Sequence, residues 1–101
     1  MLLADSHGVL MHANKHWAEL TGYDMREIEG TTASILYGPL SNNIEDEELM
    51  LKLQRGNSVR IKNSFYYRKN GTTFYNDVAW VPIKNHVSEI THYCAYMQAR
   101  T

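Results

Sequence analysis

The chain has 101 residues, with 10 Lys and Arg, 11 Asp and Glu, a formal charge of −1 and a single cysteine. This length suits one domain with one modest core, and the balanced charge lacks the clustered positive excess that nucleic-acid binding requires. No apolar run is long enough to span a bilayer, no signal-peptide pattern opens the chain, and a lone cysteine excludes an internal disulfide and a thiolate metal cluster.

The start of the chain predicts two short strands, over residues 2–4 and 9–13, joined by the turn sequence Asp-Ser-His-Gly. Asn14 follows, and its side chain can cap a helix by accepting a bond from a free backbone N–H. This helix carries Trp17 and ends at Gly22, because glycine is favoured just after a helix.

A second short helix is expected from Asp24 to Gly30. Glu27, three residues after Asp24, approximates a capping box with Asp in place of the usual Ser or Thr. Residues 34–37 suit a single helical turn, which Gly38-Pro39 would break. The two short helices and this turn therefore predict a compact, bent helical cover.

A longer helix is predicted to end at Gly56. Acidic residues crowd its start at positions 45–48, and Lys52 and Arg55 lie near its end, which is the order that the helix dipole favours. The residues that can cap it are Ser41, Asn42 and Asn43. The residues that form its packing face are Leu49, Met50 and Leu53.

The strongest local signal is the stretch over residues 65–83, in which Asn70-Gly71 separates two runs rich in aromatic and β-branched residues. Both turn residues tolerate positive φ, so the stretch predicts a tight β-hairpin. Residues 90–99 add a third long strand after a loop. The order of these elements predicts an α+β domain with one antiparallel five-stranded sheet, covered on one face by helices.

Five short motifs occur in the order and spacing typical of PAS domains, and together they cover nearly the whole chain. They are Asp5-x-x-Gly8, Asn14-x-x-Trp17, Leu20-Thr21-Gly22-Tyr23, Glu27-Ile28-x-Gly30 and Tyr67-Arg68-Lys69-Asn70-Gly71. The chain therefore resembles a PAS domain over residues 1–101. The resemblance implies a sheet in the order 2-1-5-4-3, a pocket between helices and sheet, and a role as a sensor or dimerisation module within a larger signalling protein.

Residues 30–39 are similar to the light-oxygen-voltage subfamily, whose motif is Gly-Arg-Asn-Cys-Arg-Phe-Leu-Gln-Gly-Pro. The match puts Ala33 at the photoreactive cysteine, Ser34 at an arginine that pairs with the flavin phosphate, and Thr32 at an asparagine that contacts the ring. Because alanine has no sulfur to form a flavin adduct, we expect no covalent flavin photochemistry. Cys94 is predicted on another strand, so we do not expect its thiol to replace the photoreactive cysteine that is missing at Ala33.

The same match assigns ring-contacting positions to Asn76 and Gln98, an amide pair suited to reading a ring edge. Tyr66 falls at another asparagine, and Tyr96 at a glycine beneath the flavin, so the pocket is expected to be partly filled by the chain itself. Non-covalent flavin binding stays compatible with the sequence. The pocket residues that the resemblance implies are Ile35, Leu36, Tyr66, Asn76, Val78, Trp80, Tyr96 and Gln98.

Simpler readings exist for the same residues. Asn76 and Gln98 can satisfy each other or the backbone without any ligand, and Trp17 and Trp80 can be ordinary core residues. The strand before the hairpin has two readings as well. The subfamily match turns Lys62, Ser64 and Tyr66 inward, whereas hydrophobicity favours Ile61, Phe65 and Tyr67.

The sequence gives no sign of metal, haem or catalytic chemistry. His12 and His16 have helical ligand spacing, but a strand–helix boundary is predicted between them. No histidine occurs over residues 31–56, where haem-binding PAS domains carry their axial ligand. Nothing pairs with Ser6 and His7 as a catalytic constellation, so we expect no enzyme.

Two functions follow from these observations. The first is a cytoplasmic sensor, free or part of a membrane-bound receptor, that binds a small molecule and passes the change to an output domain. The second is a cofactor-free module for dimerisation or protein–protein interaction through the outer sheet face, covered by a homodimer or a flanking helix. The large residues expected on that face are Tyr67, Tyr75, Val81 and Tyr93.

Overall fold

The computed structural model describes residues 1–37 and 43–99, with the side chains of residues 43–47 outside the description. Three expectations therefore lie outside the described residues. They are the break at Gly38-Pro39, the cap among residues 41–43 and the charge of residues 45–47.

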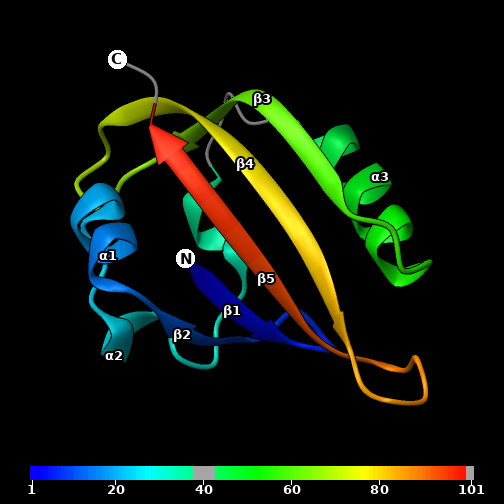
Figure 1. Ribbon diagram of the computed structural model, residues 1–101. Helices are drawn as coiled ribbons and strands as arrows, with labels where there is room; N and C mark the ends of the chain where they lie inside the picture. The colour runs from blue at the N-terminus through cyan, green and yellow to red at the C-terminus, as the bar shows by residue number, and fades with distance from the viewer. Residues whose placement is uncertain (38–42, 100–101) are drawn as a thin grey trace.

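One antiparallel sheet of five strands, in the order β2-β1-β5-β4-β3, confirms the predicted fold and strand order. The strands are β1 (Leu2–Asp5), β2 (Leu10–Ala13), β3 (Val59–Tyr67), β4 (Thr73–Lys84) and β5 (Ile90–Ala99). The helices are α1 (Lys15–Thr21), α2 (Met25–Ile28), the 3₁₀ turn η1 (Ala33–Leu36) and α3 (Asn43–Gln54). Figure 1 shows β4 and β5 crossing the front of the molecule, with η1 behind them and α1 and α3 at opposite sides.

The helices each bury an apolar residue against one face of the sheet, which we call the inner face. Their contributions to the core are Trp17, Ile28, Leu36, Leu49 and Leu53. The opposite face, which we call the outer face, keeps large side chains exposed, among them Tyr75, Val81, Ile83 and Tyr96. Core formation on one face alone leaves the other for solvent or a partner.

The predicted helix caps are present. The Asn14 side chain accepts a hydrogen bond from Trp17 N at 3.0 Å, and Gly22 ends α1 with φ of 79°. Asp24 caps α2 by accepting from Arg26 N at 2.9 Å. The second half of the expected capping box is wrong, because the Glu27 carboxylate instead contacts Lys69 Nζ at 2.6 and 2.7 Å.

The β3–β4 hairpin forms where it was predicted, but its turn is one residue longer. Arg68 N donates to Thr72 O at 2.7 Å, and Gly71 N donates to Arg68 O at 2.9 Å, which leaves residues 69–71 in the loop. Gly71 has φ of 88°, whereas Asn70 is not among the residues with positive φ. This three-residue loop ends in a left-handed glycine, and Asn70 contributes its side chain by accepting a hydrogen bond from Thr72 N at 3.0 Å.

A bulge at Asn63 reconciles the two readings of β3. Asn63 has φ of 57°, and the pairing of β3 with β4 shifts between Ile61 and Ser64. Before the bulge Val59 and Ile61 pack on the core, and after it Ser64 and Tyr66 are buried. The extra residue inverts the alternation, so hydrophobicity was right for the first half of the strand and the subfamily match for the second.

Candidate functional site

A cavity of about 140 Å³, partly open to solvent beside Thr32 and Ser34, lies on the inner face between η1, α3 and the central strands. Its floor includes Trp80 of β4 and Tyr93 of β5, and Ala33 of η1 and Leu53 of α3 close it from the helical side. The remaining lining residues are Ala4, His7, Gly8, Thr32, Ser34, Tyr37, Leu49 and Met50. Pockets for drug-sized ligands measure about 300–1,000 Å³, so this cavity suits a much smaller molecule.

Six of the eight predicted pocket residues lie on the inner side of the molecule. Leu36, Tyr66, Asn76, Val78 and Trp80 are buried, and Ile35 packs against the core from η1. Trp80 alone among the six borders the cavity, and the others form the packed core beside it. The predicted set therefore lies mostly on the inner side of the sheet, while the open space lies nearer to α3.

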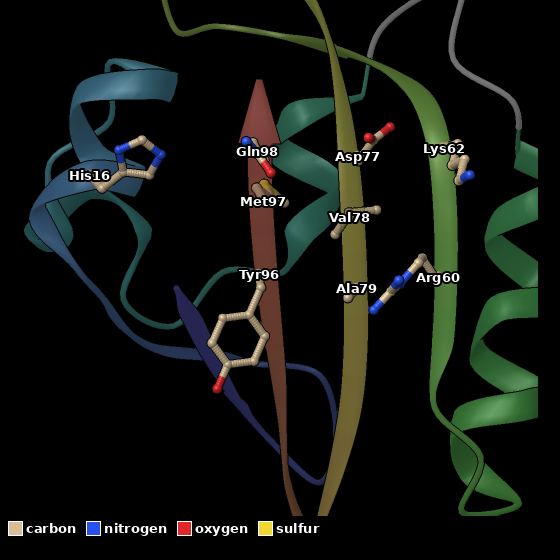
Figure 2. A pocket seen from close by; sticks show the side chains of 9 residues that line it. All are labelled: His16, Arg60, Lys62, Asp77, Val78, Ala79, Tyr96, Met97 and Gln98. Carbon is tan, nitrogen blue, oxygen red and sulfur yellow. The ribbon is translucent and has the colours of Figure 1, made fainter. Parts of the chain in front are cut away.

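The expectation that Tyr96 and Gln98 line this pocket is wrong. Tyr96 is 56% exposed and Gln98 is also exposed, and both border a groove on the outer face (Figure 2). The inward positions of β5 are Tyr93, Ala95 and Met97. In β5 the alignment to the light-oxygen-voltage subfamily was displaced by one residue. Because side chains alternate along a strand, a displacement of one residue assigns each of them to the opposite face.

A signal for the correct assignment was present in the sequence. Ala95 and Met97 are apolar, whereas Gln98 is polar, so alternation read from hydrophobicity alone favours the observed faces. Tyr93, which was expected on the outer face, is 4% exposed and belongs to the core for the same reason.

Buried polar atoms with open hydrogen-bonding capacity lie on the inner face. Asn76 is fully buried, and its Nδ2 donates to Ser64 O at 3.4 Å. Within the part of the chain that the structure describes, Asn76 Oδ1 and the indole N–H groups of Trp17 and Trp80 have no partner. Pairing between Asn76 and Gln98 is excluded because the two side chains lie on opposite faces.

The thiol of Cys94 is on the far side of the sheet from Ala33. Ala33 borders the interior cavity, whereas Cys94 lies between the inward-facing Tyr93 and Ala95 on β5. Alternation turns the Cys94 side chain to the outer face, where it is hydrogen-bonded to Tyr96 and raises the pKa of that phenol. Cys94 is therefore unable to supply a sulfur to the cavity.

A broad groove of about 600 Å³ crosses the outer face (Figure 2). Ala79 of β4 forms part of its floor, with Arg60 and Lys62 of β3 on one side and Tyr96 and Gln98 of β5 on the other. Figure 2 shows Arg60 extending from β3 toward Ala79. The groove is polar and charged, in contrast to the interior cavity.

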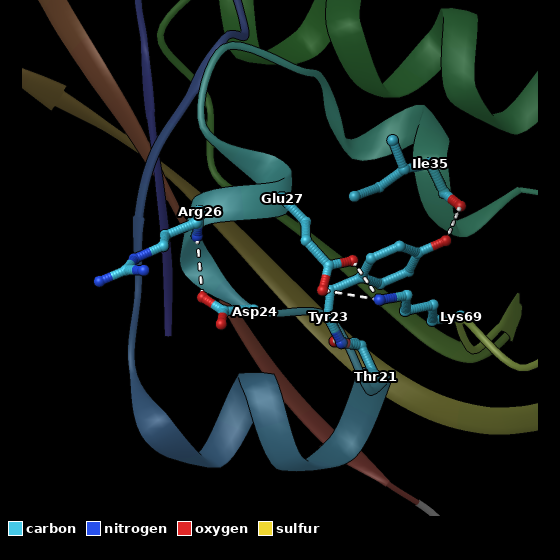
Figure 3. Close-up of polar contacts among 7 residues, drawn as sticks. All are labelled: Thr21, Tyr23, Asp24, Arg26, Glu27, Ile35 and Lys69. Carbon is cyan, nitrogen blue, oxygen red and sulfur yellow. Dashed lines mark hydrogen bonds and ion pairs between the residues drawn. The ribbon is translucent and has the colours of Figure 1, made fainter.

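The β3–β4 turn is fastened to the helical side of the molecule (Figure 3). Lys69 pairs with Glu27 of α2, and Lys69 N donates to Thr21 O at 3.0 Å at the end of α1. Beyond that junction, Tyr23 donates from its hydroxyl to Ile35 O of η1 at 3.4 Å. These contacts join the wall of the cavity to the hairpin.

No cluster of three or more His, Cys, Asp or Glu side chains occurs among the described residues, and His12 and His16 lie on β2 and α1. No described helix has the length and apolar character needed to cross a bilayer.

A sheet in this order, with short helices on one face, is also the fold of the solved structures that the chain resembles. The family model for the PAS domain matches residues 1–98, and the chain belongs to this family. PAS domains are sensory modules rather than catalysts.

Similar sequences occur in a histidine kinase and in a potassium channel. A blue-light-activated histidine kinase of Brucella anthropi is 31% identical over 84 residues, which are 83% of this chain and 17% of the kinase. The voltage-gated delayed rectifier potassium channel KCNH4 of Homo sapiens is 32% identical over 95 residues, or 88% of this chain and 9% of the channel. The chain thus spans less than a quarter of either relative.

Solved structures support the fold. The light-state structure of the blue-light photoreceptor Aureochrome1 LOV has a TM-score of 0.92 at 20% identity, covering 99% of this chain and 80% of that one. The PAS domain of the fruit-fly ELK potassium channel has a TM-score of 0.85 at 22% identity, covering 97% and 83%. At these identities the likeness establishes the fold alone.

Proposed function

We propose that this chain is the sensory PAS domain of a larger signalling protein, and that it binds a small molecule in the interior cavity. The observation that carries the proposal is the cavity of about 140 Å³ between η1, α3 and the central strands. An apolar cavity of about 150 Å³ can bind benzene, so a space of this volume can hold a small organic molecule. The chain matches only 17% of the histidine kinase and 9% of the potassium channel, which supports its place as one part of a longer protein.

Signal transfer in this proposal runs through the sheet to an attached output domain. Trp80 and Tyr93 border the cavity from strands whose neighbouring residues reach the outer face. A ligand that shifts these two rings changes the packing of β4 and β5, and an interaction partner on the outer face can read that change. The domain then works in the cytoplasm, free or as the cytoplasmic part of a membrane-bound receptor.

Thermal unfolding with added ligands tests the interior site. Benzene and indole are suitable probes, and binding to the folded state alone raises the transition midpoint. Ala33→Leu fills the cavity and should abolish the rise, while Ala79→Leu on the outer face serves as the matched control and should retain it. A midpoint that neither probe shifts, together with no co-purified small molecule in native mass spectrometry, would contradict ligand sensing at this site.

A second candidate function is association through the outer face. Tyr75 is 54% exposed and Tyr96 is 56% exposed on this face. Phe65 stacks beside Tyr75 with ring centroids 5.1 Å apart, which extends the aromatic surface toward the hairpin. Aromatic residues are enriched where proteins associate, so this face suits a second copy or a flanking helix.

Sizing in solution tests the second candidate. Tyr75→Glu places a charge among the exposed aromatic rings and should convert an associated wild type to monomer in sedimentation equilibrium. Glu89→Gln, in the exposed β4–β5 loop, is the control and should leave the mass unchanged. Identical masses for the wild type and Tyr75→Glu over a wide concentration range would argue against a homodimer through this face.

A further inference from the structure

Two aromatic residues that border the interior cavity carry polar groups without a partner. Trp80 and Tyr93 are 7% and 4% exposed, so both side chains are almost entirely buried. The indole N–H of Trp80 has no hydrogen-bond acceptor, and the hydroxyl of Tyr93 forms no hydrogen bond within the described residues. Buried polar groups in folded proteins are nearly always paired, so these two indicate a partner from outside the described chain.

The two rings start from neighbouring positions on the inner face. Trp80 is paired with Ala95 across β4 and β5, and Tyr93 is two residues from Ala95 along β5. Side chains in this diagonal arrangement start about 7–8 Å apart, which is within reach of aromatic rings. The Trp80 N–H is shielded, whereas the Tyr93 hydroxyl is not among the shielded unpaired atoms. Tyr93 is therefore the first donor that a bound molecule meets, and Trp80 can add a second after a slight rotation of its indole ring.

These groups favour a ligand atom that accepts hydrogen bonds. An indole N–H only donates, and a phenol hydroxyl can donate as well. A carbonyl oxygen has two lone pairs, so it can accept from both rings at once. A ligand group that only donates would leave the Trp80 N–H unpaired. The polar end of the ligand is therefore an acceptor.

The charge of the cavity selects among acceptors. The described residues that line it include no Lys, Arg, Asp or Glu, and the one histidine among them, His7, is exposed. A carboxylate buried beside Trp80 and Tyr93 would find no Lys or Arg among these residues to compensate for its lost hydration. An uncharged carbonyl group loses much less on burial. The cavity therefore favours a neutral acceptor over an anionic one.

The rest of the cavity suits a small apolar body. Ala33, Leu49 and Leu53 line its helical side, and its volume of about 140 Å³ limits the ligand to a ring of about the size of benzene. The opening lies beside Thr32 and Ser34, whose hydroxyl oxygens are 2.6 Å apart, so a polar molecule meets hydroxyl groups as it enters. A small ring that bears one carbonyl oxygen matches these features.

We propose that the interior cavity binds a small, uncharged carbonyl compound, such as a cyclic ketone. Its oxygen accepts hydrogen bonds from Tyr93 and Trp80, and its ring packs against Leu53 and Ala33. This inference rests on the proposed ligand sensing in the cavity and names the chemical class of the ligand. The recognised oxygen then lies against β4 and β5, the strands through which the proposed signal passes.

Two matched ligands test the proposal. They are cyclopentanone and methylenecyclopentane, in which a CH₂ group replaces the oxygen. Titrations followed by the methyl resonances of Ala33 and Leu53 measure both affinities at the cavity itself. Tyr93→Phe should weaken cyclopentanone binding about tenfold, as expected for the loss of one hydrogen bond, and should leave methylenecyclopentane binding unchanged. Tyr75→Phe removes an exposed hydroxyl on the outer face and should change neither affinity.

Further measurements separate recognition of the oxygen from packing. Trp80→Phe removes the indole N–H and also alters the cavity's shape, so its effect is read from the ratio of the two affinities, which should shift toward methylenecyclopentane. The infrared carbonyl band of bound cyclopentanone should lie below its position in hexane, because a hydrogen bond weakens the C=O bond. In Tyr93→Phe the band should return toward that position. Cyclobutanecarboxylate, an anion of similar size, should bind more weakly than the ketone.

The outcomes distinguish the ligand class from ligand sensing itself. Equal weakening of both ligands in Tyr93→Phe, or no change in either, would overturn the carbonyl ligand while leaving the cavity as a binding site. Tighter binding of the anion than of the ketone would overturn the neutral class in the same way. If none of these molecules binds, and neither benzene nor indole does, both the carbonyl ligand and the proposed sensing at this site are overturned.

Discussion

At the scale of single residues, backbone conformation and hydrogen bonding account for several positions. Gly71 has φ of 88°, and a Cβ atom added there would meet nothing within 4 Å. Any loss of folding free energy caused by a side chain at this position therefore comes from backbone strain and not from a steric clash. Asp5 holds the β1–β2 turn by accepting hydrogen bonds from His7 N at 2.8 Å and Val9 N at 3.0 Å.

Gly71→Val should lower the free energy of unfolding by about 1–3 kcal/mol, because a β-branched residue is strained at positive φ. Gly71→Asn is the matched control and should cost less, since asparagine visits the left-handed region more readily. Denaturant unfolding measures both changes. Equal midpoints for Gly71→Val and the wild type would show that the turn does not require this conformation in solution.

Stability should fall at acid pH through Asp5. Hydrogen bonds from Val9 N–H and then His7 N–H hold the pKa of the Asp5 carboxyl below its ordinary value of 3.8. A lowered folded-state pKa stabilises the domain above the unfolded-state value, and this contribution is lost as pH falls through the folded-state pKa. Asp5→Asn should therefore be less stable than the wild type near neutral pH, and the difference should shrink below about pH 3.8. A difference independent of pH, measured by urea unfolding, would rule out this linkage.

At the scale of elements, the long strands do two tasks at once. Their inner faces form the core and the cavity, and their outer faces form the aromatic surface and the basic groove. The bulge at Asn63 lets β3 change sides between Ile61 and Ser64, so that both halves of the strand present apolar residues to the core. The register of β3 therefore depends on one inserted residue.

Deleting Asn63 should destabilise the domain far more than replacing it. Without the extra residue, either Val59 and Ile61 or Ser64 and Tyr66 must turn to the outer face, and a buried set is lost. Asn63→Gly keeps the bulge and suits its positive φ, so its midpoint should equal or exceed that of the wild type. Near-ultraviolet circular dichroism and urea unfolding distinguish the two variants. A deletion variant as stable as Asn63→Gly would mean that the strand tolerates either register.

At the scale of the whole molecule, the two faces of the sheet have different chemistry. The interior cavity is small and lies between η1, α3 and the central strands, whereas the outer groove is broad and charged. The contacts of Lys69 with Glu27 and Thr21, and of Tyr23 with Ile35, connect the helical side to the hairpin that carries Tyr75. These contacts link η1, which borders the cavity, to the β3–β4 hairpin.

The purified domain should be colourless. Ala33 provides no sulfur for a flavin adduct, Cys94 faces the other side of the sheet, and the cavity of about 140 Å³ is small for a ring system of that size. An absorption spectrum of the protein purified in the dark checks this expectation. Bound flavin at near-stoichiometric occupancy would contradict it and would require the helices to open, with Asn76 as a ring contact.

The sequence alone determined the order of the elements, the family and the helix caps. These features are local, because Asn14, Asp24 and the glycines that end the helices act through their own backbone neighbours. The hairpin at Asn70-Gly71 was also predictable, since a tight turn needs a residue that adopts positive φ without strain, and Gly71 does so with φ of 88°.

The tertiary structure settled which faces the strands present, and in the sequence only the apolar alternation of Ala95 and Met97 in β5 favoured the observed faces. The sides of Tyr93, Tyr96 and Gln98 depend on a register that pairs Met97 with Val78, and a shift of one residue reverses them. The faces that the two halves of β3 present depend on the bulge at Asn63, which no local pattern in the sequence predicted. The volume of the cavity likewise depends on how η1 and α3 pack over Trp80 and Tyr93. Packing among distant segments sets these features, and alternation along a strand leaves its two faces to be chosen by that packing.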